Sequence, residues 1–108
     1  GEIMYEIKRV EDKGEQEKLC ALCNIEYDAD AFCYSAYSEG EFAGVSQFRI
    51  IGKCAHIYDV VLKNGFEDRN CLYLLGKATL NFVDLCHIKM YNYWKDIKNA
   101  FDQYLQTL

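Results

Sequence analysis

The sequence contains no proline, and it contains no uninterrupted apolar run of about 18 residues, the minimum for a membrane span. It also has no cluster of lysine and arginine, and its net charge is -5. A protein that binds nucleic acid needs a basic face to neutralise phosphates, so we expect no nucleic-acid partner. Charged and apolar residues alternate at the N-terminus, unlike the apolar core of a secretion signal. These absences predict a cytoplasmic protein that has no membrane partner.

Six cysteines are present, yet they do not form a recognisable metal or disulfide pattern. Cys20 and Cys23 make the one C-x-x-C motif, and no second motif or clustered histidine pair completes a zinc site. Nothing in the sequence indicates secretion, where disulfide frameworks occur. We therefore expect reduced cysteines that pack as small apolar side chains, and no metal.

The chain has 108 residues, of which 51% are hydrophobic and 15% aromatic, which predicts one folded domain over residues 1–108. Period-two and helical spacings predict the order β-α-β-β-β-α-β-α, an α/β (α+β) fold whose mixed, mostly antiparallel sheet is flanked by helices. The expected strands cover 3–10, 31–37, 42–51, 54–62 and 88–94, and the expected helices cover 15–25, 68–86 and 96–108.

The stretch 55–86 organises this pattern, because it joins a strand, a short connector with Gly65, and a helix that begins near Asp68. The helix N-terminus should face the C-terminal end of the strand. Unpaired backbone N–H groups and the helix dipole favour an anion or a cofactor at that place. A small anion at Arg69 and the amides of Asn70 and Cys71 is one possibility. The dipole would also lower the pKa of a thiol at Cys71.

The strands SAYSEGEFAGVSQFRIIGKCAHIYDVVL, the following KATLNFVDLCHIKMYNYW and the final AFDQYLQTL, in this element order, resemble the GNAT family of N-acetyltransferases. The resemblance implies acetyl-CoA as cofactor, bound in the opening between the strands at 54–62 and 88–94. It implies transfer to a small amine or a peptide amine. The cofactor-binding residues that it implies are Val60, Val61, Leu62, Arg69, Asn70, Cys71 and Leu72.

The same resemblance assigns catalytic roles to two residues. Tyr104 lies where the family has a general acid for the leaving thiolate, and Asp59 is the candidate base, directly or through water. A backbone N–H of Val61 or Leu62 would stabilise the oxyanion. Purely structural roles remain open for both residues. Tyr104 could be a core aromatic on the apolar stripe of its helix, and Asp59 could lie on a solvated face of the sheet. Strict alternation would place His56 and Asp59 on opposite faces, so we expect no His-Asp dyad.

Two departures from the family support a second function. Residues 67–72 (EDRNCL) occupy the place of a glycine-containing pyrophosphate loop, with Asn70 and Leu72 where glycines usually stand. The family also continues past its last helix into two more strands. The alternative is a non-catalytic GNAT-like module that has lost acetyl-CoA binding and acts through partner or dimer contacts. A homodimer through the open edge of the strand at 88–94 is then expected.

Overall fold

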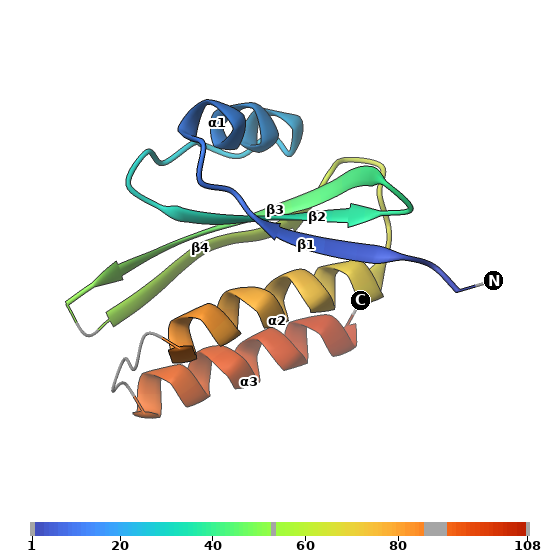
Figure 1. The fold of residues 1–108 in the computed structure, drawn as a ribbon. Coiled ribbons are helices and arrows are strands. Elements are labelled where there is room, and N and C mark those ends of the chain that lie inside the picture. Colours follow the sequence, from blue (N-terminus) through green and yellow to red (C-terminus); the bar gives the residue numbers. More distant parts are fainter. Residues whose placement is uncertain (1, 53, 86–90, 108) are drawn as a thin grey trace.

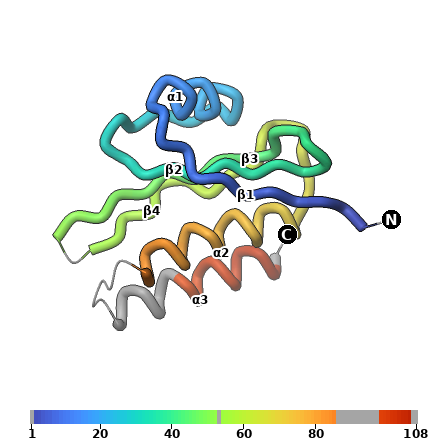
Figure 2. The backbone as a smooth tube through the Cα atoms, viewed as in Figure 1, coloured from blue at the N-terminus to red at the C-terminus, as the bar shows by residue number. Residues whose placement is uncertain are grey.

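The structure is a computed structural model that describes residues 2–52, 54–85 and 91–107, with side chains of the last helix described from 98 to 106. A four-stranded sheet lies between α1 on one face and α2 and α3 on the other (Figure 1). Figure 2 follows the same path as a tube. The elements are β1 (Tyr5–Arg9), α1 (Lys13–Leu22), β2 (Phe32–Ser38), β3 (Glu41–Ile51), β4 (Cys54–Leu62), α2 (Arg69–Leu85) and α3 (Tyr91–Thr107).

The sheet is a meander with the strand order β1-β2-β3-β4. Every pairing among the described strands is antiparallel, so the predicted meander is confirmed and the mixed sheet is not found in this part of the chain. Gly40 (φ 80°) and Gly52 (φ 62°) lie in the two hairpin turns. Both have the left-handed conformation that glycine adopts without steric cost, which explains why the chain reverses there.

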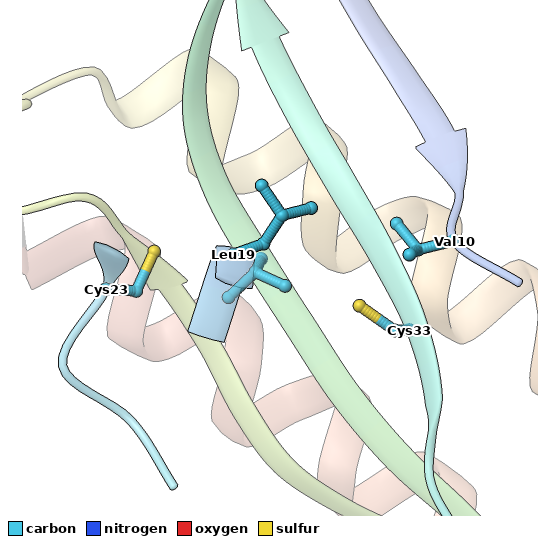
Figure 3. Packing of buried hydrophobic residues seen from close by; sticks show 5 residues of the cluster. Val10, Leu19, Cys23 and Cys33 are labelled. Atoms are coloured by element: carbon cyan, nitrogen blue, oxygen red, sulfur yellow. The ribbon is translucent and has the colours of Figure 1, made fainter. Parts of the chain in front are cut away.

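Apolar residues form a core on each face of the sheet. Between α1 and the sheet, Val10, Leu19, Cys23, Cys33 and Val45 pack together, and Figure 3 labels the first four of them. On the other face, α2 buries a stripe with helical spacing, as its sequence predicted. Its buried residues are Cys71, Leu72, Leu75, Gly76, Thr79, Leu80 and Val83.

Four of the described cysteines, Cys20, Cys23, Cys33 and Cys71, are part of the buried core. The five cysteines that the structure describes are free thiols, and all of them except Cys54 are buried. Burial raises the pKa of Cys20 to about 11 and that of Cys33 to about 12. Such thiols stay protonated and pack as apolar groups.

Element boundaries follow the sequence closely around β4 and less closely at the C-terminal end. β4 has the predicted bounds 54–62, and α2 starts directly after Asp68. α1 begins earlier than predicted, because Asp12 caps it by accepting a hydrogen bond from the Glu15 N–H at 3.0 Å. None of the helices in the described ranges is long and apolar enough to cross a membrane.

The prediction of a fifth strand over 88–94 is wrong for residues 91–94, because these residues form the start of α3. Residues 88–90 lie outside the described part of the chain. The aromatic residues there suggested a strand, but Trp94, Ile97 and Phe101 recur at intervals of three and four, so the helical period extends into this stretch. The last helix therefore does not begin at Asp96, and residues 91–94 offer no strand edge for the predicted homodimer.

Candidate functional site

A cleft of about 620 Å³ lies where β4 ends and α2 begins. We call it the junction cleft. It brings together six of the nine residues predicted for catalysis or cofactor binding, although they are up to 44 positions apart in the sequence (from 60 to 104). Its lining residues are Val60, Val61, Leu62, Phe66, Glu67, Asp68, Arg69, Leu72 and Tyr104.

The amino end of α2 is capped by the protein itself. Asp68 Oδ1 accepts a hydrogen bond from the Cys71 N–H at 3.1 Å, and the Asp68 carbonyl accepts one from the Leu72 N–H. The Tyr5 hydroxyl donates to the same carboxylate, at 2.8 Å to Oδ2. This hydrogen bond is the main reason why the pKa of Tyr5 is raised. A carboxylate thus occupies the place where the sequence predicted an anion, and the Cys71 amide is already bonded.

Cys71 and Asn70 do not line the junction cleft. Cys71 is fully buried and packs with Ala36, Ala43 and Leu75. Burial, and secondarily the Asp68 charge, raise the pKa of its thiol to about 11. The predicted lowering of this pKa is therefore wrong, because desolvation in the core outweighs the helix dipole. Asn70 lies in an adjoining groove with Tyr73.

Arg69 connects the start of α2 to the end of α3. Its Nη2 donates a hydrogen bond to the Leu105 carbonyl at 2.9 Å. Tyr104 precedes that carbonyl on α3, so this contact helps to fix the wall of the junction cleft that Tyr104 provides. The Tyr104 side chain is 51% exposed. A hydroxyl at such a wall can reach a bound ligand. Tyr104 is therefore not enclosed in the core, which was the alternative role that its place on the apolar stripe allowed.

A second cleft, of about 550 Å³, lies on the α1 face of the sheet, and we call it the loop cleft. The segment that follows α1 forms one wall, and β3 and β4 form the other. Asp59 lies here and not in the junction cleft, so the two predicted catalytic residues line different clefts. The loop-cleft residues are Ile25, Glu26, Tyr27, Asp28, Ala29, Gln47, Arg49, Tyr58 and Asp59.

The amide of Gln47 ties this cleft together, and its side chain is almost completely buried. Its Oε1 accepts hydrogen bonds from Gln16 Nε2 at 2.8 Å and from the Asp28 N–H at 3.0 Å. Its Nε2 donates to the Glu26 carbonyl at 2.7 Å and to Asp59 Oδ2 at 3.2 Å. Both donors and both acceptor positions of the amide are used, so a flipped amide would face like groups at all four contacts.

The ion pair between Arg49 and Asp28 holds the same loop. Arg49 donates to both carboxylate oxygens of Asp28, at 2.6 and 2.7 Å. This pairing keeps the pKa of Asp28 below its ordinary value and raises that of Arg49. Sequence reasoning missed Gln16, Gln47 and this pair. The available signal was a glutamine in the middle of an otherwise apolar strand.

A β-bulge changes the faces of β4. Gln47 pairs with Asp59, but the next residue of β3, Phe48, pairs with Ile57, so Tyr58 is an extra residue. Arg49 lies opposite His56. Residues that lie opposite each other in an antiparallel ladder point to the same face. Arg49 and Gln47 both bond to the loop on the α1 face, so their partners His56 and Asp59 also lie on that face. The predicted placement on opposite faces is wrong, since strict alternation does not continue through a bulge.

Among the described residues, no group of three or more histidine, cysteine, aspartate or glutamate residues could hold a metal ion. Comparisons with protein-family models, with curated proteins and with solved structures found no match to this chain. The function therefore has to be inferred from the two clefts.

Proposed function

We propose that this domain is a GNAT-like N-acyltransferase that transfers an acetyl group from acetyl-CoA to a small amine or a peptide amine. One observation carries the proposal: the end of β4, the first turn of α2 and Tyr104 converge on a single cleft of about 620 Å³. These are the elements that the family resemblance assigned to cofactor binding and to the general acid.

The junction cleft suits the thioester end of such a cofactor. Val60, Leu62, Phe66 and Leu72 provide an apolar wall for the pantetheine arm. In an antiparallel ladder, the N–H groups of successive residues point alternately toward and away from the neighbouring strand. One N–H of Val61 and Leu62 therefore points away from β3, and we assign it to the oxyanion of the tetrahedral intermediate.

The proposed reaction uses both clefts. The neutral amine attacks the thioester carbonyl, a C–N bond forms and the C–S bond breaks. Asp59, directly or through water, takes the proton that the amine loses, and Tyr104 gives one to the leaving thiolate. Asp59 and Val60 are neighbours on opposite faces of β4, which is an edge strand of the described sheet. The amine would pass this edge to reach the thioester.

A specific observation favours the second candidate, a GNAT-like binding module without acetyl-CoA. Glu67 and Asp68 both line the junction cleft, and Arg69 is the one cation in its lining. The carboxylates repel a diphosphate, and Asp68 occupies the helix N-terminus. Under the first candidate, the diphosphate must therefore lie outside the cleft, and the affinity must come mainly from the pantetheine arm.

The decisive experiment is calorimetric titration with acetyl-CoA, with CoA, and with an acetyl thioester of pantetheine that carries no phosphate, at low salt. Saturable micromolar binding of acetyl-CoA supports the enzyme. The absence of both heat and thermal shift at millimolar ligand contradicts it and leaves the binding module. If an amine screen then shows transfer, Tyr104→Phe should lower kcat with little change in the unfolding midpoint. Tyr73→Phe, outside the junction cleft, is the matched control.

A further inference from the structure

The outer edge of β4 is open within the part of the chain that the structure describes, because β4 pairs with β3 alone. The strand is nine residues long and contains neither lysine nor proline, the residues that commonly block an edge. Its polar side chains are those of His56, Tyr58 and Asp59. Bulges and charged side chains also protect edges, so a partner strand must accommodate the extra residue Tyr58 and the charge of Asp59.

We propose that β4 pairs antiparallel with β4 of a second copy, so that His56 of each copy lies opposite Asp59 of the other. An imidazole donates a hydrogen bond to a carboxylate in either protonation state, and the two-fold symmetry gives two such pairs. The β4 bulge makes the pairing possible, because it places His56 and Asp59 on the same, α1, face. Without the extra residue Tyr58, the two side chains would lie on opposite faces and could not meet.

The faces of β4 restrict the register. Ala55 and Val60 belong to apolar clusters under α2, and Val61 packs with the cluster under α1. In the proposed register, like faces meet on both sides of the bulge, where Ala55 lies opposite Val60 and Cys54 opposite Val61. At the two-fold axis between them, Ile57 of each copy lies opposite Tyr58 of the other. A register shifted by two residues also keeps like faces together, but it places His56 opposite the apolar Val61. Charge complementarity therefore selects the first register.

The dimer does not depend on the proposed acetyl transfer, but the two would share one edge. Asp59 contributes to the dimer pair and lies beside the route of the amine. If both proposals hold, the dimer is a closed resting form that opens for catalysis. The experiment below contains neither cofactor nor amine, so it tests the dimer whatever the titrations with acetyl-CoA show.

Sedimentation velocity over a dilution series at neutral pH tests this interface through a charge exchange. The native chain should sediment as a dimer that dissociates on dilution. His56→Asp places two carboxylates opposite each other twice, and should raise the dimer dissociation constant by roughly tenfold or more. The double variant with His56→Asp and Asp59→His restores both pairs in reversed order, and should recover most of that affinity. Asn81→Asp, an equal charge change on the exposed side of α2, should leave the dimer intact.

Amide hydrogen exchange then locates the contact. Exchange in β4 should slow as the concentration rises in the native chain, and should be independent of concentration in the His56→Asp variant. Circular dichroism verifies that each variant is folded. A native chain that stays monomeric throughout the series would overturn the proposal. A dimer that His56→Asp leaves unchanged, or that the double exchange does not recover, would overturn it equally.

Discussion

Replacing Gly76 by alanine tests how α3 docks on α2. A Cβ built at Gly76 would overlap the ring of Phe101 on α3, with the ring's Cε2 at 2.6 Å. Two effects then compete. Alanine in place of glycine stabilises a helix interior by about 1 kcal/mol. Forcing a methyl group into a packed contact costs about 1–3 kcal/mol, because Phe101 must leave its position.

The overlap involves the body of an aromatic ring, which cannot fold away from the new methyl group as a long flexible side chain can. We therefore expect the steric cost to exceed the gain, with a net loss of about 1 kcal/mol in the free energy of unfolding. Asn81→Ala on the exposed face of α2 is the control, and it should gain roughly 0.5 kcal/mol from helix propensity alone.

Urea unfolding followed by circular dichroism measures both variants. In a Phe101→Leu background, the smaller side chain makes room for the methyl group, so Gly76→Ala should become neutral or stabilising. The coupling between the two sites should be about 1–2 kcal/mol. If Gly76→Ala instead stabilises the native chain as much as Asn81→Ala does, Phe101 does not pack on Gly76. The position of Tyr104 on the same helix would then lose its support.

Two further predictions concern the loop cleft. Gln47→Leu removes four hydrogen bonds of the buried amide, so the free energy of unfolding should fall by about 3 kcal/mol or more. An unchanged urea midpoint would contradict the network. The second prediction concerns pH, because pairing with Arg49 lowers the pKa of Asp28 in the folded state. The stability that this pair contributes is present above the ordinary carboxyl pKa. It is lost as the pH falls through the lowered value. Arg49→Met should flatten this acid limb in thermal melts at a series of pH values, and a limb as steep as the native one would refute the assignment.

Local patterns in the sequence predicted the centre of the chain well. β4 and the start of α2 were found because apolar spacing and the capping residue Asp68 act within a few neighbouring residues. The start of α3 was missed, since a short aromatic stretch such as 91–94 satisfies both strand composition and helical spacing. Five of the seven predicted cofactor residues line the junction cleft, but burial removed Cys71 from it.

Features that depend on contacts between distant residues could not be predicted. The extra residue at Tyr58 is visible only in the register of β4 against β3, and it reverses the expected face of His56 relative to Asp59. Gln47 bonds to Gln16, 31 positions earlier in the chain, and its role as a buried connector follows from that contact. A polar residue in an apolar strand signals a partner but does not identify it.

The choice between the two proposed functions depends on charge at the start of α2, which Asp68→Asn tests directly. The helix N-terminus contributes about half a positive charge, while Glu67 and Asp68 each contribute a full negative charge and Arg69 a positive one, a sum near minus one half. The carboxamide oxygen of asparagine, placed at the Oδ1 position, can still accept both the Cys71 N–H and the Tyr5 hydroxyl proton, so the cap survives and only the charge is removed. For a phosphate that lies outside the cleft but about 6 Å from this carboxylate, removing one charge at an effective dielectric constant of about 40 favours binding by about 1.4 kcal/mol, or roughly tenfold. Under the enzyme proposal, calorimetry should show this gain for CoA and no change for the acetyl thioester of pantetheine. Equal affinities of the native chain and the variant for CoA would mean that no phosphate lies near this end of α2.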